Sequence, residues 1–208
     1  VWYRLVMQGM GVGLLLTDTD VFPNQPWVLL GVLIGSIGLL NACNFMDGIN
    51  GMMALNSLVA VGTLWVWLYL TPNPLTCALL PATFGALLVF SYFNVRRRAI
   101  WFAGDVGSIS VAFVVLTGLL VIISQFQTYL PVLLLAVYGV DTGLTIGYRL
   151  LRRQPLFRAH RQHLFQQVVD RRRWPHLYVA GAYALVQAGI NGLVLLALRW
   201  SPGEQAWL

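Results

Sequence analysis

Two short polar stretches in a very apolar chain hold the residue types best suited to chemistry. The first is 41–51, Asn-Ala-Cys-Asn-Phe-Met-Asp-Gly-Ile-Asn-Gly, which lies between apolar runs at 26–40 and 52–70. The second is 102–108, Phe-Ala-Gly-Asp-Val-Gly-Ser, and another apolar run follows it. An ionisable residue at the end of a membrane helix is costly and usually marks a functional site. We therefore interpret the two stretches as halves of one site at one membrane face.

Asp47 and Asp105 are the acidic residues of these stretches. Carboxylates on a water-accessible rim suit Mg²⁺, which often binds through one or two carboxylates together with substrate phosphates. Gly104 and Gly107 allow close backbone approach, and Ser108 is predicted to cap the helix that follows. The N-terminus of that helix would present free N–H groups to a phosphate. N-capping is the structural alternative for one such aspartate, but two on one face favour a functional site.

A third candidate motif, His160-Arg161-Gln162-His163, lies in an arginine-rich stretch at 151–175. Two histidines alone do not complete a metal site. A guanidinium group beside imidazoles fits phosphate binding better, because its donors match phosphate oxygens. A solvated basic loop is the alternative interpretation.

Asp141, Thr145 and Arg149 follow one another at intervals of four residues. This spacing predicts that the three side chains lie near one face of a helix. A structural ion pair and a place in the functional site both remain open for Asp141.

The composition identifies an integral membrane protein. Of 208 residues, 58% are hydrophobic and 10% are charged, whereas soluble domains carry about 25% charged residues. Apolar runs of suitable length predict seven transmembrane helices in an all-α polytopic fold. They lie at about 3–16, 26–42, 50–70, 75–93, 107–124, 129–150 and 176–198. We expect 1–208 to form a single integral membrane domain, and nucleic-acid binding is not expected of so apolar a chain.

The distribution of charge predicts the orientation of these helices. All 13 basic residues are arginine, and most lie in 94–106 and 151–175, whereas the connections 17–25, 71–74 and 125–128 have none. The positive-inside rule places the two arginine-rich segments in the cytoplasm. Counting the predicted crossings puts 42–50 on the same side. The site loops near 41–51, 94–108 and 151–175 are therefore expected at the cytoplasmic face.

At these motifs the chain resembles the polyprenyl-phosphate N-acetylhexosamine-1-phosphate transferases of bacterial membranes. The stretch 41–51 resembles the asparagine–aspartate motif of that family. The stretch 102–108 resembles its glycine–aspartate–glycine–serine motif, whose aspartate binds Mg²⁺, and 160–163 resembles its histidine motif. Asp141-Thr142 resembles the helix that precedes the histidine loop. The motifs occur in the family's order and cover nearly the whole chain.

The chain also departs from the family pattern. The family has about ten membrane helices and an adjacent aspartate pair on a cytoplasmic loop, whereas this chain has seven predicted helices and no Asp-Asp. Arg4 and Gln8 resemble the residues that follow that pair. The resemblance implies that the chain is the C-terminal part of the fold and is inactive as a transferase by itself. Asn50 stands where a second aspartate is usual, and Ala159 replaces a frequent proline.

The resemblance implies a function for the intact enzyme. It would transfer a sugar-1-phosphate, of the N-acetylhexosamine type, from a UDP-sugar to undecaprenyl phosphate and release UMP. This reaction would take place at the cytoplasmic face of the bacterial inner membrane, in cell wall or lipopolysaccharide synthesis. The UDP-sugar, undecaprenyl phosphate and the lipid bilayer are the implied partners, and a homodimer is an open alternative.

The resemblance also implies roles for individual residues. Asp47 and Asp105 would be catalytic, with Asp105 as the ligand of Mg²⁺ and Mn²⁺ as an alternative ion. Substrate binding would fall to a wider set, namely Asn41, Asn44, Gly104, Ser108, His160, Arg161 and His163.

Two other classes of protein remain open on the residues alone. An intramembrane aspartyl protease also uses two aspartates, but these must share a proton inside the bilayer. Here Asp105 lies in an interfacial stretch, seven residues after Arg98. An anion transporter with broken helices would gather its polar residues near the bilayer midplane, not at one face. Release of UMP from a UDP-sugar would distinguish the three classes.

Overall fold

The computed structural model describes residues 2–18, 26–70, 74–126, 128–155 and 161–199. Within these ranges the chain is helical, without strands. The elements are α1 (Trp2–Asp18), α2 (Pro26–Met46), α3 (Met52–Leu70), α4 (Pro74–Asn94), α5 (Gly104–Phe126), the 3₁₀-helix η1 (Leu130–Leu135), α6 (Ala136–Leu151), α7 (Leu164–Arg172) and α8 (His176–Arg199). All seven predicted apolar runs fall on helices, which confirms the all-α polytopic membrane fold.

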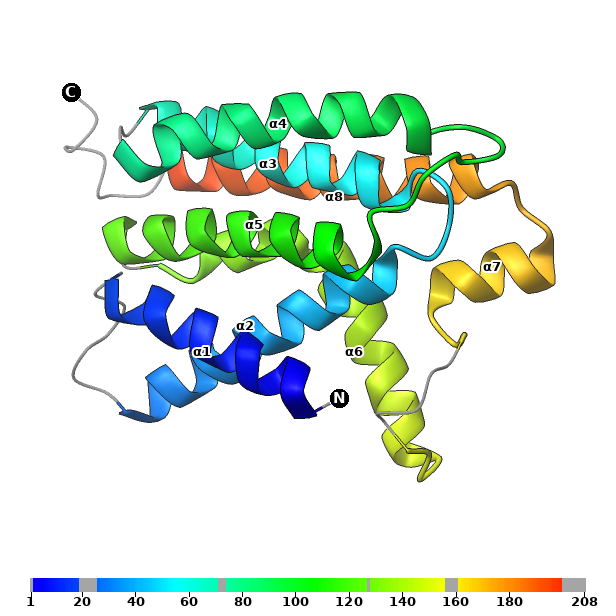
Figure 1. Cartoon of the computed structure of the whole chain (residues 1–208), viewed down its shortest axis with the longest axis horizontal. Helices are drawn as coiled ribbons and strands as arrows, with labels where there is room; N and C mark the ends of the chain where they lie inside the picture. The colour runs from blue at the N-terminus through cyan, green and yellow to red at the C-terminus, as the bar shows by residue number, and fades with distance from the viewer. Residues whose placement is uncertain (1, 19–25, 71–73, 127, 156–160, 200–208) are drawn as a thin grey trace.

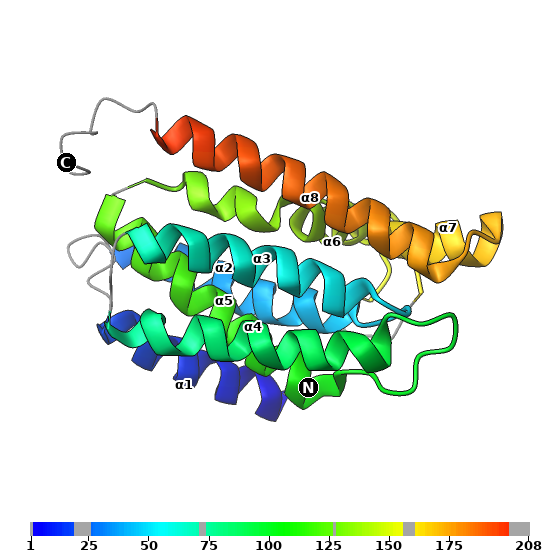
Figure 2. The ribbon, with the colours of Figure 1, turned by 90° about the horizontal axis from the view of Figure 1, so that it is seen from above.

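Among the described residues, four helical segments are long and apolar enough to cross a membrane, namely 26–46, 104–126, 130–151 and 176–197. Two shorter apolar segments, Met52–Leu68 and Ala78–Asn94, accompany them. The most buried of the four long segments is α5, which packs against α2, α3 and α4. Figures 1 and 2 show α3, α4 and α8 running beside one another, with α1 and α2 crossing on the other side of α5. The core therefore forms around α5.

The polar stretches of the sequence gather at one end of the bundle. Figure 1 shows α2 ending, α3 beginning, α4 ending and α5 beginning at the end of the molecule where α7 lies. The turn 47–51 and the loop 95–103 connect these helices. The structure also places one short helix, α7, in the arginine-rich stretch 151–175. The turn 47–51, the loop 95–103 and α7 therefore lie at one end of the bundle.

The apolar run 129–150, expected as one helix, is divided between η1 and α6. Pro131 lies at the start of η1, and a buried glutamine of α8 satisfies the backbone where the helix type changes. The side chain of Gln187 accepts a hydrogen bond from the Val137 N–H at 2.9 Å and donates one to the Leu133 carbonyl at 3.0 Å. Buried backbone groups need such partners, so Gln187 stabilises the break between η1 and α6.

Candidate functional site

The two aspartates of the predicted site lie at the contact between the end of α2 and the start of α5. The Asn44 side-chain amide donates a hydrogen bond to Asp105 Oδ1 at 2.9 Å. In the opposite direction, the Gly104 N–H donates to Asp47 Oδ2 at 2.9 Å. The two polar stretches are therefore joined by direct hydrogen bonds, although more than 50 residues separate them in the sequence. This supports the interpretation that they form one site.

Local backbone geometry explains the glycines at this contact. Gly104, the first residue of α5, has φ +63°, and Gly51, at the end of the turn after α2, has φ +81°. Residues with a side chain rarely adopt positive φ, because Cβ approaches the following carbonyl oxygen. A Cβ added to Gly104 would meet no heavy atom within 4 Å. The space over Gly104 is therefore open, and the backbone beside Asp105 is accessible to a ligand.

Arg4 of α1 belongs to this site, although the sequence placed it only in a family motif. Its guanidinium donates to Asp105 Oδ2 at 3.3 Å and to Asn41 Oδ1 at 3.0 Å. The Asn41 amide in turn donates to Gln8 Oε1 at 2.9 Å and to the Ile37 carbonyl at 2.8 Å. The sequence did contain a signal for Arg4, because Arg4 is the one charged residue within the apolar run 3–16. Asn41 therefore orients Arg4 toward Asp105.

The environments of the two aspartates differ. The Asp105 side chain is 72% exposed. Burial raises the pKa of Asp47 to about 6, against the opposing effect of hydrogen bonds from the Gly104 and Ala103 backbone. Asp47 Oδ1 is buried, and no donor for it is found among the described residues. Asp47 is thus an unusually basic carboxylate with a spare acceptor beside an exposed carboxylate.

These two carboxylates suit Mg²⁺ better than a metal held by a protein cage. The described residues contain no group of three or more His, Cys, Asp or Glu side chains placed to hold a metal. Mg²⁺ does not need such a group, because it usually binds through one or two carboxylates, waters and substrate phosphates. The exposure of Asp105 and the open space over Gly104 fit that mode of binding.

The histidine motif is divided by the structure. His160 lies outside the described residues. Arg161 is largely exposed and forms an ion pair with Asp170 at 3.2 Å. His163 is 2% exposed, and its Nδ1 lies 3.5 Å from Asp141 Oδ1. Its ring centroid is 6.0 Å from that of Phe45 near the end of α2, so His163 packs close to the first polar stretch.

Two expectations about side-chain roles need correction or refinement. Ser108 does not cap α5, because the helix begins at Gly104 and Ser108 lies within it. Its side chain is fully buried, and its hydroxyl donates to the Gly104 carbonyl at 2.7 Å. Asn50, where the family usually has aspartate, donates from its side chain to the Arg96 and Arg97 carbonyls at 3.0 and 2.9 Å. Asn50 therefore fixes the loop 95–103.

The shared helix face predicted for Asp141, Thr145 and Arg149 is confirmed. All three are buried on α6, and the Thr145 hydroxyl donates to the Asp141 carbonyl at 2.8 Å. Arg149 donates to the Pro155 carbonyl and to Gln162 Oε1. This face of α6 therefore contacts the chain on both sides of residues 156–160.

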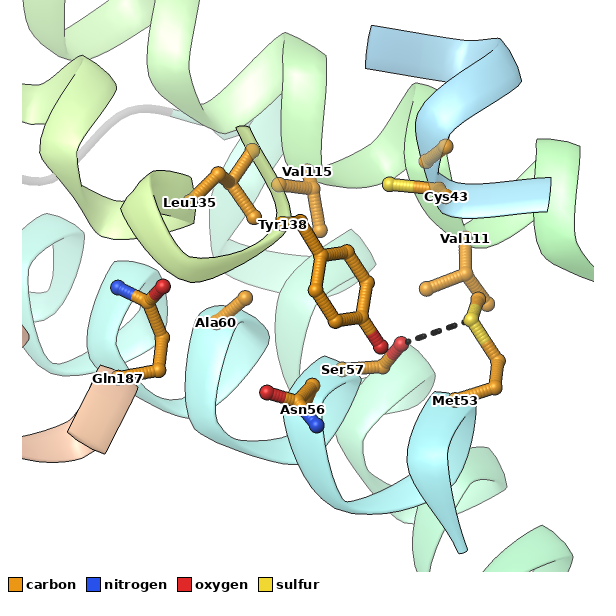
Figure 3. Close-up of a pocket in the computed structure, with 11 residues that line it drawn as sticks. Cys43, Met53, Asn56, Ser57, Ala60, Val111, Val115, Leu135, Tyr138 and Gln187 are labelled. Atoms are coloured by element: carbon orange, nitrogen blue, oxygen red, sulfur yellow. Dashed lines mark hydrogen bonds between the residues drawn. The ribbon is translucent and has the colours of Figure 1, made fainter. Parts of the chain in front are cut away.

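A cavity inside the bundle is unsuited to a polar substrate. Figure 3 shows it between side chains that include Cys43, Asn56, Tyr138 and Gln187. Its wall is almost entirely apolar, and it has room for about one water molecule. Substrate binding is therefore better assigned to the polar end of the bundle than to this cavity.

Comparisons with known proteins identify the family of this chain. Residues 1–125 match the family described as glycosyl transferase family 4. A probable undecaprenyl-phosphate N-acetylglucosaminyl 1-phosphate transferase of Bacillus subtilis is 28% identical over 137 residues, 64% of this chain and 38% of the relative. A phospho-N-acetylmuramoyl-pentapeptide-transferase of Streptococcus pyogenes serotype M49 is 32% identical over 111 residues, 53% of this chain and 33% of the relative.

A phospho-N-acetylmuramoyl-pentapeptide-transferase of Campylobacter jejuni is 28% identical over 174 residues, which is 74% of this chain and 46% of the relative. The chain thus spans a third to just under half of the length of these relatives. The family match contains both polar stretches and Arg4. Because that match covers more than half of the 208 residues, the chain belongs to glycosyl transferase family 4.

Proposed function

We propose that the whole protein transfers an N-acetylhexosamine-1-phosphate from a UDP-sugar to undecaprenyl phosphate and releases UMP. The observation that carries the proposal is the hydrogen-bonded cluster of Asn44, Asp105, Gly104 and Asp47 at one end of a membrane bundle. Relatives named for undecaprenyl-phosphate and muramoyl-pentapeptide phosphotransfer support it. The arginine-rich segments at the same end favour the cytoplasmic face of the bacterial inner membrane.

The chemistry of phosphoryl transfer suits the residues of this cluster. Such reactions depend mainly on positioning and on stabilisation of charge, so few residues must form covalent bonds. Asp105, exposed and next to open space, would hold Mg²⁺, with Asp47 Oδ1 as a further oxygen beside it. When bound, Mg²⁺ would neutralise charge on the diphosphate oxygens. Asn44 orients the Asp105 carboxylate through its 2.9 Å hydrogen bond.

Cationic side chains at the same end would bind the anionic parts of the substrates. Arg4 is half-buried and already within 3.3 Å of Asp105. A guanidinium group held there can donate two parallel hydrogen bonds to a phosphate. The exposed Arg161 and the buried His163 lie on the arginine-rich segment around α7. We assign Arg4 to the phosphates next to Asp105, and Arg161 and His163 to the nucleotide sugar.

The test is a reaction of the full-length protein in membranes. UDP-N-acetylglucosamine and UDP-N-acetylgalactosamine are each supplied with undecaprenyl phosphate, and UMP and the lipid-linked sugar are measured. With Mg²⁺ or Mn²⁺, we expect UMP and the lipid-linked sugar to form in equal amounts. With EDTA, we expect neither UMP nor the lipid-linked sugar. Release of UMP without a lipid product, or no UMP from any UDP-N-acetylhexosamine tried, would contradict the proposal.

A further inference from the structure

Asp141 has an environment that the proposed chemistry does not explain. It lies within α6 and is 3% exposed, yet it is far in sequence from the other acidic residues of the site. A buried carboxylate is strongly unfavourable unless charge or hydrogen bonds compensate its lost hydration. The donors around Asp141 therefore show what this carboxylate is bound to.

Three hydrogen-bond donors converge on the Asp141 carboxylate from α7 and α8. The backbone N–H groups of Leu164 and Phe165, at the start of α7, donate at 2.8 and 3.4 Å. The Tyr183 hydroxyl of α8 donates at 2.8 Å. The Nδ1 atom of His163, the residue before α7, lies 3.5 Å from Oδ1. A helix N-terminus has unpaired N–H groups and a partial positive charge, both of which favour an anion. Asp141 thus holds the N-terminus of α7 from a neighbouring helix.

The start of α7 packs in turn against the turn that carries Asp47. Phe165 is fully buried, and its ring lies 3.1 Å from the place that a Cβ on Gly48 would occupy. His163, the residue before α7, stacks on Phe165 with ring centroids 5.8 Å apart. Because Gly48 follows Asp47 directly, the position of α7 affects both the histidine motif and the first polar stretch.

We propose that Asp141 is a positioning residue of the transferase site, which fixes α7 so that His163 and Phe165 are held against the Asp47–Gly48 turn. This inference rests on the proposed function for its effect on catalysis, but not for its effect on α7. The carboxylate does not contact the reacting groups. Instead, the Asp141 carboxylate positions α7 and the preceding His163, which we assign to binding of the nucleotide sugar.

A carboxylate is needed at this position because the neighbouring groups are donors. Ionised aspartate offers two acceptor oxygens, whereas asparagine offers one oxygen and an NH₂ group. In Asp141→Asn, the NH₂ group would replace one of the two oxygens and would face a backbone N–H of α7, that of Leu164 or that of Phe165. We therefore expect α7 to loosen while α6 and α8 remain folded, since their backbone hydrogen bonds are internal to each helix.

The experiment compares three variants of the full-length protein in lipid nanodiscs. Asp141→Asn changes the carboxylate, and Tyr183→Phe removes one of its donors with little change in volume. Gln187→Leu is the matched control, because it removes buried hydrogen bonds at the η1–α6 break and leaves the contacts of α7 intact. Hydrogen exchange of 164–172, the unfolding temperature and the KM for each substrate are measured.

We expect Asp141→Asn to accelerate exchange in 164–172 and to raise the KM for the UDP-sugar by about tenfold, with the KM for undecaprenyl phosphate nearly unchanged. Tyr183→Phe should show the same pattern more weakly. Gln187→Leu should lower the unfolding temperature without either effect. Unchanged exchange of 164–172 in Asp141→Asn, or a UDP-sugar KM within about twofold of the parent value, overturns the inference. Failure of the parent protein to release UMP contradicts the proposed function instead, and the exchange result still decides the role of Asp141 in placing α7.

Discussion

Asn44 and Asp105 are joined by a 2.9 Å hydrogen bond across the contact between α2 and α5. The bond uses an amide donor from one polar stretch and a carboxylate acceptor from the other. A second hydrogen bond, from the Gly104 N–H to Asp47, runs in the reverse direction. These paired contacts hold the two aspartates at one end of the bundle, and they motivate the first prediction.

Asp105→Asn in the full-length enzyme is expected to abolish turnover without unfolding the protein. Asparagine keeps the volume and one oxygen but lacks the negative charge that a hard divalent cation requires. UMP release at saturating Mg²⁺ and the unfolding temperature are measured. The control is Asp18→Asn, which lies at the end of α1 away from Arg4. Turnover above about a tenth of the parent value, a loss under about 1.4 kcal/mol of transition-state stabilisation, would show that Asp105 does not hold the metal.

The pKa of Asp47 predicts a specific dependence of stability on pH. Because burial raises this pKa from 3.8 to about 6, the folded state binds the proton more tightly than the unfolded state does. The contribution of Asp47 to stability is therefore fully present below about pH 4 and is lost as pH rises through about 6.

Comparison of the parent protein with Asp47→Asn isolates this effect from other titrating groups. The unfolding temperature of each is measured in detergent between pH 4 and pH 8, a range chosen to bracket the pKa of about 6. We expect the variant to gain stability relative to the parent as pH rises through that value. Parallel curves for the two proteins would contradict the assigned pKa.

Asn50→Asp is expected to destabilise the protein, although the family motif that 41–51 resembles usually has aspartate at this position. The Asn50 amide donates to two carbonyls, those of Arg96 and Arg97. An ionised aspartate would place its oxygens against these acceptors, at a cost of about 1–3 kcal/mol. The unfolding temperature should fall near neutral pH and recover in acid, where the protonated carboxyl can donate one hydrogen bond. An unfolding temperature equal to that of the parent at neutral pH would exclude this role.

Gly48→Ala tests the contact between the Asp47 turn and α7. The new methyl group would lie 3.1 Å from the buried Phe165 ring, so that ring must move by a few tenths of an ångström. We expect both stability and UMP release to decrease. Gly181→Ala on α8 is the control, because its Cβ would meet no heavy atom within 4 Å and alanine favours helix by about 1 kcal/mol over glycine. Equal activity in the two variants would show that the contact is unimportant.

The orientation in the membrane predicts which sites can be labelled from outside intact cells. Single cysteines are introduced at Tyr129 and at Arg171, both exposed, in a protein whose native cysteines are replaced. A membrane-impermeant maleimide should label position 129 in intact cells and position 171 only after permeabilisation. The reverse pattern would contradict a cytoplasmic site.

The sequence by itself determined the helices, because an apolar run long enough for the bilayer has few alternatives to a helix. It also determined that Asp47 and Asp105 share one end, since alternating crossings and arginine-rich loops constrain which helix ends meet. The shared face of Asp141 and Thr145 followed from the helix period. These features depend on local pattern and on the order of crossings.

Only the tertiary structure decided which partners the polar side chains have. The capping predicted for Ser108 was wrong because α5 begins four residues earlier, at Gly104. The Gly104 N–H donates a hydrogen bond to Asp47 at this helix start. The local sequence pattern does not predict that contact. Arg4 and Asp105, which form an ion pair, are 101 positions apart in the sequence. Asp141 and Leu164, the first residue of α7, are 23 positions apart and are joined by a hydrogen bond. Such contacts arise from the packing of whole helices, so the spacing of residues along one helix contains no information about them.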